Sequence, residues 1–173
     1  MTRIFSILLL SLLTTHLFAQ QVPCNCELLI NPTYFGKVPL YDQPNGKVLR
    51  SLRNDSLNED YLLIKVEKDS ADYFYGAVSY AISGKSWKGW IKKKKYVGTY
   101  SRNYGPKLIL YTEANEQSKP VCIIKEHVSK IGLCTVLKCS NRWVYVKLSN
   151  GKREFKGWLS PDMQCASAYT TCN

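Results

Sequence analysis

The chain repeats itself, and this repeat limits the folds that it can adopt. Residues 88–92 read Lys-Gly-Trp-Ile-Lys and residues 156–160 read Lys-Gly-Trp-Leu-Ser, which places the two tryptophans 68 residues apart. Upstream, residues 38–41 end in a tyrosine that lies 70 residues before the tyrosine ending residues 108–111. Three further matches lie in order between these landmarks: residues 64–68 with 134–138, residues 73–75 with 143–145, and Trp87 with Phe155. Such a period predicts two consecutive copies of one structural unit.

Each unit has the pattern of short β-strands. Residues 143–148 alternate between apolar and other side chains, which is the two-residue period of a strand with one buried face. The predicted core-facing residues are Val144, Val146 and Leu148, and the opposite face holds Trp143, Tyr145 and Lys147. No window of the chain shows a convincing helical stripe. We therefore expect an all-β protein in which each unit of about five strands forms a small barrel.

Turn residues support this assignment. Asn150-Gly151 follows the strand at 143–148 and predicts a tight hairpin, because both turn positions favour residues that accept positive φ. Gly84 stands at the corresponding place in the first unit. The next strand of each unit holds a Gly-Trp step, and we expect its tryptophans, Trp90 and Trp158, to pack inward.

The motifs of the second unit resemble those of bacterial SH3-like (SH3b) domains. Residues 141–152 and 156–160 resemble the central hairpin and last strand of that family, and Tyr111 with residues 120–124 is similar to its first long loop and second strand. The first unit is less similar, since Tyr73 replaces the hairpin tryptophan. The resemblance implies two tandem small SH3-like β-barrels, of a kind that binds peptidoglycan or other envelope components. It also implies that Tyr111 lies near Trp143.

The start of the chain has the features of a secretory signal. Arg3 precedes an apolar run at residues 4–13, and a small residue, Ala19, stands at the expected cleavage point. The run is too short to span a bilayer, so no integral membrane segment is expected. We expect a secreted or periplasmic protein. A lipid anchor on Cys24 is the alternative, but the residues before it lack the small side chain that a lipoprotein signal usually carries.

The expected organisation has six segments. These are a signal peptide at 1–19, an N-terminal arm at 20–36, a first SH3-like barrel at 37–97, a linker at 98–104, a second SH3-like barrel at 105–162 and a disulfide-containing tail at 163–173.

The expected export determines which chemistry the seven cysteines favour. An oxidising compartment favours disulfides, and without a Cys-x-x-Cys pair a zinc site is not expected. We expect no metal or other cofactor. The favoured local bridge is Cys165 with Cys172, and we expect either Cys24 or Cys26 to tie the N-terminal arm to the body. The odd number leaves at least one cysteine without an intramolecular bridge, and the rest of the connectivity stays open.

Groups for catalysis are scarce. The sequence has two histidines, and signal removal leaves only His127, in a polar loop. The carboxylates of residues 59–60 and 67–72 lie among lysines in apparent turns, whereas a glycosidase needs two facing carboxyls, one of them kept neutral by burial. No glycine-rich phosphate loop occurs. We therefore expect neither an enzyme nor catalytic residues.

Charge and aromatic content indicate a binding protein. The chain has 24 Lys and Arg against 13 Asp and Glu, and four lysines stand together at 92–95. This charge attracts anions, and after export we expect envelope polymers, acidic glycans or anionic lipid headgroups rather than nucleic acid. The alternative interpretation of the lysine run is a solvated strand end that maintains solubility.

Aromatic rings can stack on sugar faces or hold a peptide. The candidate ligand-binding residues are Trp143, Tyr145, Lys147, Arg142 and Tyr111 in the second unit, and Tyr41, Tyr73 and Trp87 in the first. We expect a non-catalytic envelope protein that binds a cell-wall glycan or peptide. The alternative is an adaptor or inhibitor that binds an exported protein. The oligomeric state is not predicted.

Overall fold

The computed structural model describes residues 23–102, 107–125 and 131–169, and these residues form an all-β structure, as expected. One 3-10 turn, η2 (Pro161–Met163), accompanies the strands. The strands are β1 (Cys26–Ile30), β2 (Val38–Tyr41), β3 (Val48–Leu52), β4 (Leu62–Asp69), β5 (Tyr73–Tyr80), β6 (Ser86–Lys92), β7 (Val97–Ser101), β8 (Leu108–Tyr111), β9 (Pro120–Ile124), β10 (Cys134–Ser140), β11 (Trp143–Asn150), β12 (Arg153–Leu159) and β13 (Gln164–Cys165).

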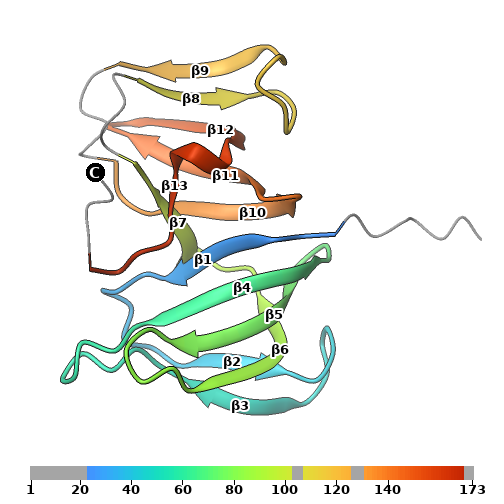
Figure 1. The fold of residues 1–173 in the computed structure, drawn as a ribbon, viewed down its shortest axis with the longest axis vertical. Helices are drawn as coiled ribbons and strands as arrows, with labels where there is room; N and C mark the ends of the chain where they lie inside the picture. The colour runs from blue at the N-terminus through green and yellow to red at the C-terminus, as the bar shows by residue number, and fades with distance from the viewer. Residues whose placement is uncertain (1–22, 103–106, 126–130, 170–173) are drawn as a thin grey trace, which may run out of the picture.

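The strand order shows the internal repeat directly. The sheet runs β3-β2-β6-β5-β4-β1-β7-β10-β11-β12-β8-β9, with β13 paired to β7 off this path (Figure 1). Its first five strands, β3-β2-β6-β5-β4, correspond to its last five in mirrored order, β9-β8-β12-β11-β10. We call β2–β6 the first half and β8–β12 the second half. The repeat read from the sequence is thus confirmed in the pairing of the strands.

Irregularities in the ladders repeat as well. The register between β4 and β5 shifts at Val66/Lys68, and that between β10 and β11 shifts at Val136/Lys138. The two short hairpins β2–β3 and β8–β9 shift at the residue pairs Leu40/Tyr41 and Leu110/Tyr111. Because a β-bulge bends the strand that carries it, matching bulges give the two halves the same local curvature.

The two halves meet through β1 and β7. β1 pairs with β4 of the first half, β7 pairs with β10 of the second, and β1 and β7 pair with each other at Leu29↔Gly98 and Ile30↔Val97. A Cβ on Gly98 would lie 2.3 Å from the carbonyl oxygen of Cys134, so only glycine allows this approach of the backbones. The strands form one open antiparallel sheet, and two closed barrels are not confirmed. β1 lies in the expected arm, and β7 lies in the expected linker except for Val97, the last residue of the expected first barrel. The segment boundaries stay predictions.

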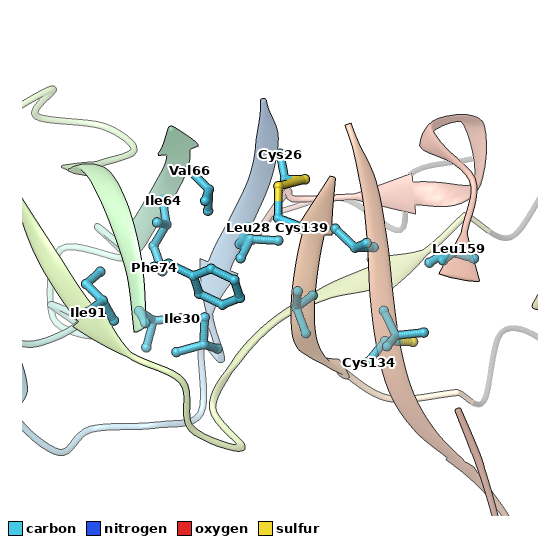
Figure 2. Packing of buried hydrophobic residues seen from close by; sticks show 14 of the residues in the cluster. Cys26, Leu28, Ile30, Ile64, Val66, Phe74, Ile91, Cys134, Cys139 and Leu159 are labelled. Atoms are coloured by element: carbon cyan, nitrogen blue, oxygen red, sulfur yellow. A yellow bond between two sulfur atoms is a disulfide. The ribbon is translucent and has the colours of Figure 1, made fainter. Parts of the chain in front are cut away.

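The buried residues form a core that continues through the junction, as Figure 2 shows. Leu28 and Ile30 of β1 pack in the same cluster as Phe74 of the first half and Leu159 of the second. The alternation predicted for β11 is confirmed, since Val144, Val146 and Leu148 are at most 2% exposed. The buried cluster is therefore continuous across the junction of the two halves.

A disulfide between Cys26 and Cys139 fastens β1 to β10, across the junction. This confirms that Cys24 or Cys26 ties the N-terminal arm to the body. Cys165 is also disulfide-bonded. Its expected partner, Cys172, lies outside the described residues, as do the expected signal peptide and His127. The Cys165–Cys172 pairing therefore stays a prediction.

Two hairpin turns differ from the sequence-based prediction. Asn150 pairs with Arg153, so the β11–β12 turn consists of Gly151 and Lys152, of which Gly151 has the positive φ (61°). The hairpin is confirmed, but its turn starts one residue later than Asn150-Gly151 suggested and has glycine in the first position, as type II′ turns require. The β10–β11 turn was missed. Asn141 and Arg142 both adopt positive φ, at 42° and 71°.

Candidate functional site

The Gly-Trp step faces the opposite way from the prediction. Gly157 lies on the core-facing side of its strand, where an added Cβ would be 2.8 Å from Cβ of Leu110. Gly89 lies equally close to Leu40 in the first half. Because side chains alternate along a strand, Trp158 and Trp90 therefore lie on the outer face, half-buried. The inward placement expected for these two tryptophans is wrong. The crossing strand leaves room only for glycine on the inner face.

This reversal completes an aromatic cluster on the outer face of the second half. Trp158 stands between Tyr145 of β11 and Tyr111 of β8 in the strand register. The ring centroids of Tyr145 and Trp158 are 5.4 Å apart, and those of Tyr111 and Trp143 are 5.9 Å apart in an edge-to-face arrangement. The expected proximity of Tyr111 and Trp143 is confirmed. We call Tyr111, Trp143, Tyr145 and Trp158 the second aromatic cluster.

The first half carries the same arrangement at matching positions. Trp90 of β6 stands between Tyr41 of β2 and Tyr75 of β5. The ring centroids of Tyr75 and Trp90 are 5.2 Å apart, and those of Tyr41 and Tyr73 are 5.7 Å apart, again edge to face. We call Tyr41, Tyr73, Tyr75 and Trp90 the first aromatic cluster.

Access to the rings differs between the clusters. Tyr73 is only 4% exposed, and its hydroxyl donates a hydrogen bond to Oδ1 of Asn45 in the β2–β3 loop. Its counterpart, Trp143, is half-buried, as are the other three members of the second cluster. Burial, followed by the charge of Glu116, raises the pKa of Tyr111 above its usual value, so this hydroxyl stays protonated at neutral pH. The second cluster offers the more accessible ring surface.

Lysines accompany both clusters. Nζ of Lys68 lies 5.5 Å from the ring centroid of Tyr75, and Nζ of Lys138 lies 5.8 Å from that of Tyr145, at the matching position of the second half. Lys147 shares the outer face, as predicted, and forms an ion pair of 2.5 Å with Glu154. Both partners are more than 40% exposed, and surface pairs of this kind are weak, so an anionic ligand can compete for the lysine.

Two predicted ligand residues do not join the clusters. Trp87 lies on the core-facing side of β6, half-buried at the edge of the core, where it meets Tyr80 edge to face at 6.0 Å. Arg142 lies in the β10–β11 turn and lines a cavity at the junction of the halves. No ring contact of Arg142 is seen among the described residues. The ligand role of the remaining candidates stays a prediction.

Two of the four lysines at residues 92–95 make contacts within the folded protein. Lys93 forms an ion pair of 2.5 Å with Asp69 and is largely buried, while Nζ of Lys92 lies 5.7 Å from the ring centroid of Tyr73. The other oxygen of Asp69 accepts a hydrogen bond of 2.6 Å from the backbone nitrogen of Cys139, which ties the first half to the second. Only Lys94 and Lys95 are exposed. The free positive charge of this segment is thus smaller than its sequence indicates.

Two buried thiols and one of the paired carboxylates have environments that account for them structurally. Burial raises the pKa of the Cys134 thiol to about 12 and also raises that of Cys122, so neither is a thiolate at neutral pH. Asp60, one of the paired carboxylates, accepts hydrogen bonds from the backbone nitrogens of Ile82 and Ser83 and so holds a loop. The described part of the chain contains no group of three His, Cys, Asp or Glu side chains that could hold a metal ion. A search of the same residues for a membrane-spanning helix finds none.

Sequence reasoning missed Tyr75, Trp90 and Trp158 as members of this surface. Their signal was present in the alternation with Phe74, Ile91 and Leu159, which are apolar and lie one residue away in the same strands. Comparisons of the chain with protein-family models, with curated proteins and with solved structures found no match.

Proposed function

We propose that this protein is a non-catalytic, exported envelope-binding protein whose two halves are SH3-like modules that recognise peptidoglycan or another anionic envelope polymer. The observation that carries the proposal is the aromatic cluster with an adjacent lysine, present on the outer face of each half. Rings that lie edge to face leave part of each ring open for stacking, and lysines beside them add attraction for acidic groups.

Two sites on one chain suit a repetitive ligand. A polymer that engages both clusters binds more tightly than either cluster alone, because the second contact forms within the complex. The disulfide and the continuous core fix the halves relative to one another, which lowers the entropy cost of engaging both. Export is supported by the Cys26–Cys139 disulfide, which oxidising compartments favour.

The test is co-sedimentation of the purified, oxidised protein with isolated cell-wall sacculi over a range of salt concentrations. The protein should pellet at low salt and be released as salt rises. Trp143→Ala should weaken the association by about 1 to 3 kcal/mol, if stacking resembles that of rings on nucleic-acid bases. Trp87→Phe is the matched control, since the equivalent residue of the second half is Phe155 and both lie at the core edge.

Two outcomes would reject the proposal. One is the absence of pelleting at low salt. The other is an equal loss of binding in Trp143→Ala and Trp87→Phe. A Trp143→Ala protein that no longer folds would assign Trp143 to the core, and circular dichroism distinguishes this case from a folded, weakly binding variant.

A second candidate function is suggested by the two ends of the sheet. The terminal strands expose large apolar side chains, Val48 and Leu49 on β3 and Val121 and Ile123 on β9, each at least 48% exposed. Free strand edges with apolar side chains can pair with an extended segment of another protein. A pull-down from an envelope extract that keeps one protein band after muramidase digestion would favour this adaptor role over polymer binding.

A further inference from the structure

A polar cavity of about 400 Å³ lies at the junction of the two halves, apart from the aromatic clusters. Its lining comes from segments that are far apart in the sequence. These are Asn25 and Glu27 at β1, Arg102 after β7, Arg142 in the β10–β11 turn, and Gln164 and Ser167 near the C-terminus. A volume of this size accommodates a small ligand.

Hydrogen bonds hold the walls of this cavity together. The side-chain amide of Gln164 donates to the carbonyl oxygens of Arg142 (2.8 Å) and Leu159 (3.1 Å). The backbone carbonyl of Gln164 accepts from Nε of Arg102 at 2.9 Å. On the opposite side, the backbone nitrogen of Asn141 donates to the carbonyl of Pro23 at 3.2 Å. The turn that carries Arg142 is therefore fixed on both sides.

Three charged side chains line the cavity, Glu27, Arg102 and Arg142, and Arg102 is already engaged with the carbonyl oxygen of Gln164. Glu27 and Arg142 are both exposed, and neither forms an ion pair with any residue that the structure describes. A simple anion in this cavity would meet the carboxylate of Glu27, and a simple cation would meet the guanidinium of Arg142. A ligand with one charge of each sign would complement both.

We propose that this cavity binds a small zwitterion, namely an amino acid or a short peptide with a free ammonium and a free carboxylate. The ligand carboxylate accepts hydrogen bonds from the guanidinium of Arg142, whose planar donors match a carboxylate. The ligand ammonium donates to the carboxylate of Glu27, and Asn25 and Ser167 offer neutral partners. This binding is independent of the aromatic clusters and of the function proposed for them.

The test uses isothermal titration calorimetry on the oxidised protein with three probes: dialanine, its N-acetyl derivative and its C-terminal amide. Dialanine should bind, and each blocked derivative should bind at least about tenfold more weakly, because each loses one charge-assisted hydrogen bond. Equal binding of all three probes, or no heat and no thermal shift with millimolar dialanine, would overturn the proposal.

Two variants assign the ends of the ligand. Glu27→Gln should remove the preference for dialanine over the N-acetyl derivative and keep the preference over the amide. Arg142→Gly should do the reverse, and glycine suits the turn because φ at this position is 71°. Arg153→Gln, which changes an exposed cation that lines a different cavity, is the control and should leave all three affinities unchanged. Retention of both preferences in both variants would refute the assignment, and the probe comparison on the unaltered protein stands even if a variant fails to fold.

Discussion

The Cys26–Cys139 disulfide closes the junction between the halves, and its removal tests how strongly the unfolded chain is constrained. The two cysteines are separated by 113 positions. In the chain-entropy description, a crosslink across a loop of about 100 residues stabilises the folded state by roughly 4 to 5 kcal/mol. The double variant Cys26→Ala/Cys139→Ala should therefore lose about this much free energy of unfolding.

The choice of variant matters because Cys24 lies close to the bond. The Cys24 thiol donates a hydrogen bond of 3.1 Å to the carbonyl oxygen of Cys139, so replacing Cys26 alone would leave two neighbouring thiols that can form a new bridge. The double variant avoids this exchange. Cys122→Ala/Cys134→Ala is the matched control, since it removes two buried sulfur atoms that form no bridge. The difference between the two double variants isolates the crosslink from the loss of packing.

The assay is urea unfolding under non-oxidising, non-reducing conditions, followed by tryptophan fluorescence. If the free energy of unfolding falls by about 2 kcal/mol per molar urea, the unfolding midpoint should be about 2 M lower than that of the control. A difference below about 1 kcal/mol would refute the reasoning, because the unfolded chain would then gain little freedom when the bond is lost. It would also show that the non-covalent contacts across the junction hold the halves together without the bond.

Three further predictions concern other parts of the molecule. Gly157→Ala should destabilise the protein by about 1 to 3 kcal/mol because the added Cβ would crowd Leu110, whereas Gly132→Ala, where no atom lies within 4 Å of the new Cβ, should be neutral in the same thermal or urea unfolding assay. Cys134 should resist a thiol reagent at pH 8 until the protein unfolds, because burial raises its pKa to about 12; rapid labelling of the native state would contradict this. Burial acts to raise the pKa of Asp60, but the hydrogen bonds from Ile82 and Ser83 outweigh burial, so the pKa is lowered. The ionised carboxylate should therefore stabilise the fold above about pH 4, and this stabilisation should be lost as pH falls through the lowered pKa. Asp60→Asn should flatten this acid limb of the unfolding curve, and an unchanged limb would count against the loop-anchoring role.

Local patterns were sufficient to predict the strands and the repeat. Alternation in β11, the glycine-containing hairpins and the absence of a helical stripe all depend on residues close together in sequence, and the structure confirms each of them. The same is true of the shared face of Trp143 and Tyr145. Side-chain direction in a strand is set by backbone geometry alone, so alternation along the sequence predicts which side chains share a face.

The placement of the Gly-Trp step could not be obtained in this way. Whether a residue faces the core depends on which strand crosses it, and β2 and β8, which crowd Gly89 and Gly157, begin 51 and 49 positions earlier in the chain. Hydrophobicity alone would place tryptophan in the core and glycine on the outer face. Steric exclusion by the crossing strand, from Leu40 on β2 and Leu110 on β8, reverses that order and so creates the candidate site.

The sequence by itself therefore determined the all-β class, the repeated unit and the faces of individual strands. The tertiary structure alone decided that β1 and β7 pair to join the halves in one sheet, that Cys26 bridges to Cys139, and that Glu27 and Arg142 share a cavity. Each of these depends on contacts between residues more than 60 positions apart. Such contacts are selected by the packing of the whole core, a free-energy balance that no local pattern of residues contains.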